Sequence, residues 1–260
     1  ALLDAGTFRE LLGPFERLES PWLEPQGIVP QSDDGVIIAR GSIAGQDAVV
    51  IAIEGAFQGG SIGEVSGAKI AGAFELALRD CEQGRPVYPV LSVESGGVRL
   101  QEANLGLNDI AEICAAMVSL RHYVPVIGVI AGMVGSFGGM SIAAGLCSYL
   151  IATREARLGL NGPEVIEQEG GIEEFDAHDR PLIWSVDGGE QRYACGLVDV
   201  LVEDDAQAII AAIQECLRQG LPAHRSSQVD HYRALLANID LTQQIDSTTA
   251  QAIFGKGGTQ

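Results

Sequence analysis

The sequence predicts an α/β protein with a mostly parallel sheet, and three features point to that class. Short apolar runs alternate with amphipathic helical stretches along most of the chain, as in successive strand–helix crossovers. The 33 glycines favour a backbone that turns sharply and often. An apolar fraction of 47% in 260 residues is enough to bury a substantial core.

We expect a main domain over residues 34–225, between an N-terminal arm over 1–33 and a helical C-terminal tail over 226–260. Prolines from Pro14 onward interrupt regular structure in the arm, so we expect it to lie on a neighbouring surface. Near the start of the arm, four apolar residues have the spacing of a short amphipathic helix: Phe8, Leu11, Leu12 and Phe15.

The main domain is predicted to alternate strands and helices, each recognised by its periodicity or by an apolar run bounded by turn residues. It begins with a hairpin that turns at 44–46. The polar, glycine-bearing stretch 169–193 is interpreted as a loop with little regular structure. In chain order, the predicted elements are strands over 35–43 and 47–53, a helix over 64–81, a strand over 90–93, a helix around 110–120, a strand over 126–131, a helix after 139, a strand over 149–152, a helix start at 162–168, a strand over 198–202, a helix over about 204–218 and a tail helix from 227.

The charge balance disfavours some classes of partner. The net charge is −19, from 35 acidic and 16 basic residues, whereas nucleic-acid and anionic membrane surfaces call for clustered Lys and Arg. No apolar segment reaches the roughly 18 uninterrupted residues of a membrane span. The five cysteines are scattered without a Cys-x-x-Cys pair, which favours reduced thiols over a zinc site or a disulfide framework. We therefore expect a cytoplasmic protein with no nucleic-acid, membrane or metal partner.

Three glycine pairs each follow a predicted strand and precede a helix: Gly59-Gly60, Gly96-Gly97 and Gly138-Gly139. Because the carboxyl ends of parallel strands lie on one side of a sheet, these turns can converge on one crevice. Two convergent N–H donors form an oxyanion hole, each worth roughly 3–4 kcal/mol of transition-state stabilisation. Taken singly, each pair is better explained as a plain turn of the chain.

Known phosphate and nucleophile motifs do not match these turns. None has the Gly-x-Gly-x-x-Gly spacing, and the third lacks the lysine of a P-loop. In the third turn Ser136 directly follows a glycine, unlike the Gly-x-Ser-x-Gly nucleophile elbow. The residues alone therefore leave phosphate, carboxylate and thioester enolate open as the anion that the turns bind.

Three segments together resemble, in order, the carboxyltransferase beta subunit of acetyl-CoA carboxylase: 57–70 (FQGGSIGEVSGAKI), 94–102 (ESGGVRLQE) and 162–168 (GPEVIEQ). The resemblance covers about residues 35–205 and implies the ClpP/crotonase fold, a superhelix of repeated ββα units. The chain lacks the N-terminal four-cysteine zinc ribbon of that subunit and carries the polar stretch 169–193. Both features are similar to the beta subunits of biotin-independent malonate decarboxylases.

That resemblance implies an activity and a set of partners. With a homologous gamma subunit, such a beta subunit converts malonyl-S-acyl carrier protein to the acetyl thioester and CO2. A separate alpha acyl-transferase subunit recharges the carrier protein with malonate. The implied substrate is carried on the phosphopantetheine-type prosthetic group of the carrier, and no cofactor is bound directly. Loss of CO2 moves negative charge onto the thioester oxygen, so the catalyst mainly needs convergent N–H donors and a dry pocket.

The resemblance also implies the site residues. The catalytic donors are expected in two of the turns, at Gly96, Gly97, Gly138 and Gly139, and the sequence does not decide which amide of each pair faces the oxygen. Substrate binding is assigned to five further residues: Gly59, Gly60, Ser95, Arg99 and Ser136.

Other polar residues have competing interpretations. Ser141 stands about where hydratases of the superfamily carry a catalytic glutamate, which argues against water addition, and the serine itself is expected to pack in a helix. Glu94 and Glu102 are candidate acid–base partners, with capping or solvated carboxylates preferred. Arg99 suits the malonyl carboxylate or carrier phosphate and a structural ion pair equally well. His178 is expected to be a surface histidine.

A carrier protein is usually acidic, so it requires a local basic contact on this acidic chain or docks mainly on the partner subunits. The basic residues nearest the turns are Lys69, Arg79, Arg99 and Arg121. Two alternative functions stay open. One is a carboxyltransferase subunit of a biotin-dependent acyl-CoA carboxylase, in which the same donors stabilise the same enolate. The other is a non-catalytic scaffold subunit whose glycine turns are purely structural.

Overall fold

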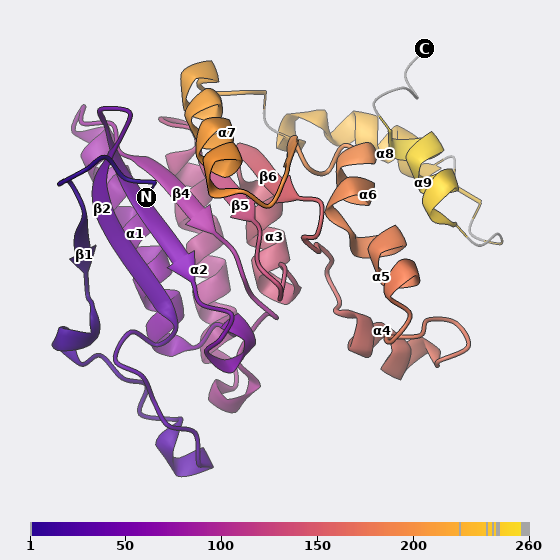
Figure 1. Ribbon diagram of the computed structural model, residues 1–260, viewed down its shortest axis with the longest axis horizontal. Coiled ribbons are helices and arrows are strands. Elements are labelled where there is room, and N and C mark those ends of the chain that lie inside the picture. The colour runs from indigo at the N-terminus through magenta and orange to yellow at the C-terminus, as the bar shows by residue number, and fades with distance from the viewer. Residues whose placement is uncertain (1, 224, 238, 241, 243–244, 256–260) are drawn as a thin grey trace.

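The computed structural model describes residues 2–223, 225–237, 239–240, 242 and 245–255. Among them, seven strands form one sheet in chain order, so each strand pairs with its sequence neighbours (Figure 1). The first three strands pair antiparallel, and from β3 onward all pairs are parallel. The strands are β1 (Arg9–Leu11), β2 (Val36–Ile43), β3 (Gln46–Ile53), β4 (Tyr88–Ser92), β5 (Ile127–Ile130), β6 (Tyr149–Thr153) and β7 (Val200–Val202).

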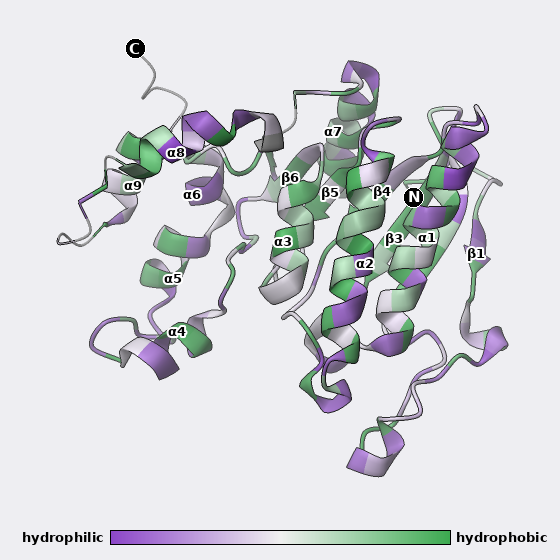
Figure 2. Ribbon diagram, turned by 180° about the vertical axis from the view of Figure 1, so that it is seen from behind, coloured by the Kyte–Doolittle hydropathy of each residue, from purple (hydrophilic) through white to green (hydrophobic). Residues whose placement is uncertain are grey.

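Both faces of this sheet are covered, as expected for parallel strands. Helices α1 (Glu64–Glu82), α2 (Leu105–Leu120) and α3 (Gly138–Leu146) lie side by side on one face (Figure 2). Their buried side chains, among them Phe74, Met117 and Met140, share a core with residues of the sheet. Helix α7 (Ala206–Gln219) covers the other face, where Ile213 and Leu217 pack against the strands (Figure 1).

The remaining helices form a group beside the β6–β7 end of the sheet (Figure 1). They are α4 (Pro163–Gly170), α5 (Arg180–Asp187), α6 (Gly189–Ala194), α8 (Val229–Ala237) and α9 (Ser247–Phe254). Short 3₁₀ turns occur at Pro14–Glu16, Glu24–Gln26, Gln58–Gly60, Leu100–Glu102 and Arg225–Gln228. Within the described part of the chain, no helix has the length and apolar character needed to cross a bilayer.

A second, shorter tier of strand pairing follows the carboxyl ends of the parallel strands. Isolated parallel bridges join Ile62 to Val98, Ser95 to Ser136, and Ser136 to Leu158. These segments lie after β3, β4, β5 and β6, and the first three lead into α1, α2 and α3. Strand, short strand and helix therefore repeat along the chain, which confirms the crotonase-like ββα arrangement.

The predicted hairpin is confirmed. β2 and β3 pair over eight residues each, from Val36 opposite Ile53 to Ile43 opposite Gln46. Ala44 and Gly45 connect them with φ values of 50° and 78°, as a two-residue turn of the mirror-image type requires.

The short helix predicted around 8–15 is wrong. Arg9–Leu11 instead forms β1 on the edge of β2, and Phe8 and Phe15 are 62% and 95% exposed. Pro14 prevents a helix from extending through this stretch, while the edge of β2 offers unpaired backbone groups to an extended segment. The arm therefore adds a strand to this chain's own sheet.

The loop predicted over 169–193 is also wrong, because α5 and α6 occupy its second half. Asp179 caps α5 by accepting the N–H of Leu182 at 3.1 Å, and Pro181 lies in the first turn. Ile183 is 4% exposed, so this short helix has a buried face. Its Asp-x-Pro start was the available signal, and polar neighbours conceal the periodicity of so few residues.

Candidate functional site

The structure brings the three glycine turns together at the carboxyl ends of β3, β4 and β5. The N–H of Gly96 donates to the carbonyl of Gly59 at 2.9 Å, which ties the second turn to the first. The second and third turns touch directly, since a Cβ built on Gly138 would lie 2.9 Å from the Cα of Gly97. The predicted convergence on one place is therefore present.

Glycine is required at the meeting point by conformation as well as by space. Gly97 and Gly138 have φ values of 119° and 56°, which side chains other than glycine rarely adopt. In the first turn, a Cβ on Gly60 would lie 1.8 Å from the carbonyl oxygen of Glu94. A plain surface turn has no need for such close approach, so these glycines serve the packing of one turn on the next.

The backbone hydrogen bonds distinguish the amides that the sequence left equivalent. The N–H of Gly96 is used by Gly59, and the N–H of Gly138 donates to the carbonyl of Leu160 at 2.8 Å. The N–H of Gly97 donates to the Ser95 hydroxyl at 3.2 Å. The N–H of Gly139 has no acceptor among the described residues, and it belongs to the first turn of α3. Gly139 thus carries a free donor among the described residues, and the Gly97 N–H makes the longest of the other three hydrogen bonds, to a side-chain hydroxyl.

The position of Gly139 adds a favourable field. The first N–H groups of a helix lack intrahelical acceptors and carry the positive end of its dipole. An anion at the start of α3 is therefore stabilised by both the amide and the helix. A cavity of about 210 Å³ lies alongside, lined in part by Ser141 and Leu160.

Arg99 lies just after the second turn and is 1% exposed. Its guanidinium donates to both carboxylate oxygens of Asp34, at 2.9 and 3.0 Å, and to the carbonyl of Ser61 at 2.8 Å. It also lies over the ring of Phe57, 5.2 Å from the centroid. Of the two roles left open by the sequence, the geometry is that of the structural ion pair.

Two acids, Asp34 and Glu102, extend this buried network to the start of α1. Asp34 accepts the N–H of Ser66 at 3.0 Å, and Glu102 accepts the N–H of Glu64 at 2.7 Å, so both cap the start of α1. Burial raises the pKa of Asp34, and the charge of Arg99 opposes that rise. The preferred interpretation of Glu102 as a capping carboxylate is confirmed.

The remaining predicted residues are distributed around the turns. Ser95 and Ser136 are both fully buried and form one of the short parallel bridges. The Ser141 hydroxyl donates to the carbonyl of Gly138 at 2.7 Å, so it packs within α3 as expected. Glu94 accepts the N–H of Val134 at 3.2 Å and would collide with a Cβ on Gly132, so it joins the second turn to the loop before the third.

The basic residues proposed for the carrier are mostly occupied elsewhere. Lys69 is 4% exposed and donates to the carbonyl of Asp33 at 2.7 Å, and burial lowers its pKa. Arg121 is 7% exposed and donates to the carbonyl of Leu146 at 3.2 Å. Arg79 is exposed near the end of α1. Together with the ion pair of Arg99, these positions do not form a basic patch beside the turns.

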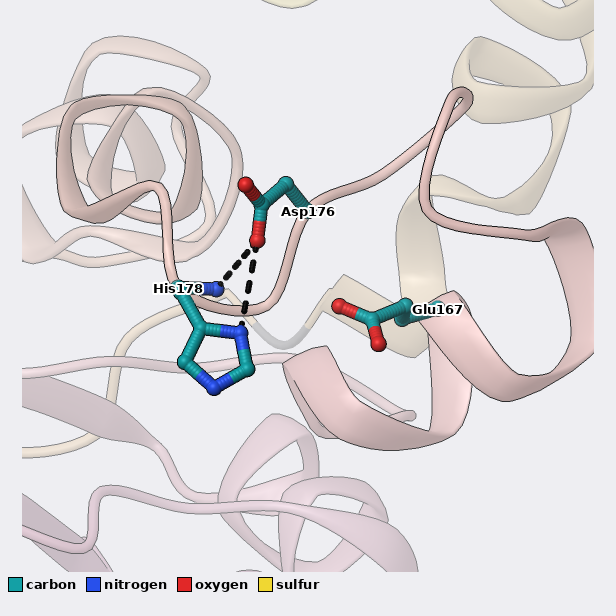
Figure 3. Close-up of side chains that lie close together, drawn as sticks. All are labelled: Glu167, Asp176 and His178. Carbon is teal, nitrogen blue, oxygen red and sulfur yellow. Dashed lines mark hydrogen bonds and ion pairs between the residues drawn. The ribbon is translucent and has the colours of Figure 1, made fainter.

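Three side chains of the 163–178 region gather next to one another: Glu167, Asp176 and His178 (Figure 3). Their ligand atoms lie within 4.8 Å of one another, but each carboxylate accepts a backbone N–H of the same loop. The His178 side chain is 87% exposed and contacts Asp176 at 3.4 Å. His178 is therefore a surface histidine, as predicted, and the two carboxylates hold the backbone of its loop by hydrogen bonds.

Sequence reasoning missed three residues near the turns. Asp109 on α2 is 7% exposed, and one of its carboxylate oxygens has no partner among the described residues. Burial, with smaller contributions from nearby acids, raises its pKa to about 6. Arg157 and Trp184 line a cavity of about 910 Å³ beside the loop that leads into the third turn. An aspartate between apolar helix positions was a usable signal, whereas the Arg–Trp contact has no pattern in sequence.

The carboxyl transferase domain family matches residues 1–247 of the chain. The malonyl-S-ACP:biotin-protein carboxyltransferase MADC of Malonomonas rubra is 37% identical, over 100% of this chain and 86% of that protein.

Two solved structures are also similar. One chain of a Pseudomonas malonate decarboxylase hetero-tetramer in complex with malonate is 60% identical, with a TM-score of 0.95 over 97% of this chain and 92% of that one. A chain of the Pseudomonas malonate decarboxylase MdcD-MdcE hetero-dimer is 54% identical, with a TM-score of 0.77 over 91% of each chain.

Proposed function

The chain belongs to the carboxyl transferase domain family, and we propose that it is the beta subunit of a malonate decarboxylase. With a homologous gamma subunit it decarboxylates malonyl-S-acyl carrier protein to acetyl-S-acyl carrier protein and CO2. The carrier presents the malonyl group on a phosphopantetheine-type arm, and a separate alpha subunit recharges the carrier with malonate. Support comes from 54–60% identity to chains of Pseudomonas malonate decarboxylase assemblies.

The observation that carries the chemistry is the contact between the second and third glycine turns. Cleavage of the C–C bond releases CO2 and leaves an enolate whose thioester oxygen is negatively charged, and the enolate carbon then takes a proton from a general acid or a water to give the acetyl thioester. We assign that oxygen to the N–H groups of Gly97 and Gly139. Gly96 and Gly138 donate to backbone carbonyls, whereas Gly139 has no acceptor among the described residues and Gly97 donates at 3.2 Å to the Ser95 hydroxyl, which the substrate oxygen replaces in this proposal. Fixed donors of this kind stabilise the transition state more than the ground state, in which the thioester oxygen is uncharged, and that difference accelerates the reaction.

Arg99 has a different role in this proposal from the one first considered. Its guanidinium is committed to Asp34 and Ser61, so it holds the second turn instead of binding the malonyl carboxylate. Ser95 and Ser136, both fully buried, likewise hold the turns together. The substrate contacts are then mainly backbone, from the glycines of the turns.

The test is CO2 release from malonyl-S-acyl carrier protein by the purified beta–gamma complex, with and without a biotinylated acceptor. Release that does not depend on the acceptor is the expected result. Strict dependence on biotin supports the second candidate, a biotin-linked carboxyltransferase, which the 37% identity to the Malonomonas rubra protein favours. No turnover in either case supports a scaffold subunit.

The dependence on gamma is tested separately. We place the crevice against the gamma subunit, because exposed apolar side chains border the turns, including Leu100 (82% exposed), Ile142 (54%) and Leu160 (61%). The beta chain alone should therefore be only weakly active. Full activity of the isolated chain contradicts this placement.

A further inference from the structure

Arg157 contacts the third glycine turn through both its side chain and its backbone. It lies after β6, and its guanidinium donates to the carbonyls of Met133 at 2.7 Å and Val134 at 3.3 Å. Its own carbonyl accepts the N–H of Ser136 at 2.9 Å. Side chain and backbone of one residue thus hold the loop between β5 and α3 at three points.

Aromatic rings fix the guanidinium in place. Its central carbon lies 5.7 Å from the centroid of the Phe137 ring and 5.2 Å from that of Trp184. Phe137 is the residue immediately before α3, so the stack reaches the helix start itself. Trp184 belongs to α5, and its ring N–H donates to the carbonyl of Glu155 at 3.2 Å. A planar guanidinium suits such a stack, whereas a lysine ammonium does not.

The fit around Arg157 leaves little freedom. A Cβ on Gly135 would lie 2.5 Å from the Arg157 carbonyl oxygen, so the loop and the 156–158 segment are in close contact. On the other side, Arg157 forms an antiparallel bridge with Gly188, the residue that separates α5 from α6. The helices that replace the expected loop at 169–193 therefore support Arg157 from outside, and Arg157 supports the turn.

We propose that Arg157, clamped by Trp184, is a positioning residue that sets the direction of the Gly139 N–H donor. The expected effect on kcat rests on the proposed function, whereas the positioning of the turn by Arg157 does not. Small misplacements of a reacting group are costly, and a shift of about 1 Å reduces rate on the order of 100-fold. Arg157 itself touches no reacting atom in this account.

The experiment compares Arg157→Met, Arg157→Lys and Trp184→Leu in the beta–gamma complex. Arg154→Met is the matched control, because Arg154 also follows β6 but its ion pairs within the described part of the chain are with surface acids, Glu190 and Glu203. Two readouts are taken: hydrogen exchange of the 132–139 amides, and kcat and KM for malonyl-S-acyl carrier protein.

Arg157→Met should speed exchange at 132–139 and lower kcat about 10- to 100-fold, with KM within about twofold of the wild type. Arg157→Lys should restore part of kcat, since an ammonium can still donate to the two carbonyls but cannot stack. Trp184→Leu should show a smaller loss of the same kind, and it serves as the test if Arg157→Met does not fold. Arg154→Met should change neither readout.

Unchanged exchange and unchanged kcat in folded Arg157→Met overturn the proposal, and so does a rise in KM alone, which indicates a substrate contact. An equal loss in Arg154→Met also overturns it. If the wild-type complex releases no CO2 while Arg157→Met still loosens 132–139, the positioning role stands and the proposed function fails.

Discussion

The second and third glycine turns meet at one point but are held there in different ways. The second turn is followed by Arg99, whose ion pair with Asp34 is almost completely buried. The third turn is held by Arg157, which is only half-buried and lies over the ring of Trp184 on α5 and that of Phe137 before α3. The second turn is therefore anchored by a buried ion pair, whereas the third is anchored by contacts at the edge of the core.

This difference separates stability from activity. Removing one partner of a buried ion pair leaves an uncompensated charge, so damage near the second turn should appear first as a loss of stability. Damage at the third turn should appear first as a loss of rate.

Arg99→Met should destabilise the chain by about 3–5 kcal/mol, because Asp34 stays buried without its partner. Urea unfolding measures the loss. Arg85→Met is the control, since Arg85 pairs with Asp80 while 63% exposed and such surface pairs contribute about 1 kcal/mol or less. Equal small losses for both variants contradict the claim that the second turn is anchored in the core.

Gly139→Pro should lower kcat by about 100- to 1,000-fold, because proline removes the N–H assigned to the enolate oxygen while fitting the first turn of a helix. Gly139→Ala keeps that N–H and is the matched control for steric contact with Ile110, whose nearest atom is 2.8 Å from the added Cβ. Steady-state kinetics and thermal melting are compared for both. A similar loss in the alanine variant attributes the effect to packing and contradicts the donor assignment.

Asp109 should make the chain less stable as the pH rises from about 4 to about 6. Its folded pKa of about 6 lies above the value of an exposed aspartate, so the native state holds more protons than the unfolded state in this window. Asp109→Asn should flatten this part of the pH profile and stabilise the chain at pH 7 by about 1–2 kcal/mol. Chemical unfolding at several pH values measures the free energy of unfolding of both proteins. If Asp109→Asn leaves its pH dependence unchanged, Asp109 is not the titrating group.

Much of this architecture was predictable from local patterns. The glycine pairs, the β2–β3 hairpin and the alternation of strands and helices all follow from turn chemistry and periodicity, which act over a few residues. The segment resemblance added the ββα fold, which the short bridges at Ile62, Ser95 and Ser136 confirm.

The errors arose where tertiary contacts decided the outcome. Arg9–Leu11 is extended because β2 offers an edge, although its neighbours have helical spacing. Helix α5 is stabilised by a cap and a few buried side chains that a polar composition conceals. The choice between Gly138 and Gly139 depends on the carbonyl of Leu160, more than 20 positions away, which no pattern around the turn indicates.

In this mechanism, one amide from each of the second and third turns binds the thioester oxygen. The most direct measurement is a crystal structure of the beta–gamma complex with a malonyl-thioester analogue. We expect the carbonyl oxygen of the analogue within about 2.7–3.1 Å of the backbone nitrogens of Gly97 and Gly139. An oxygen bound instead by the amides of Gly96 and Gly138, or by neither turn, contradicts this account.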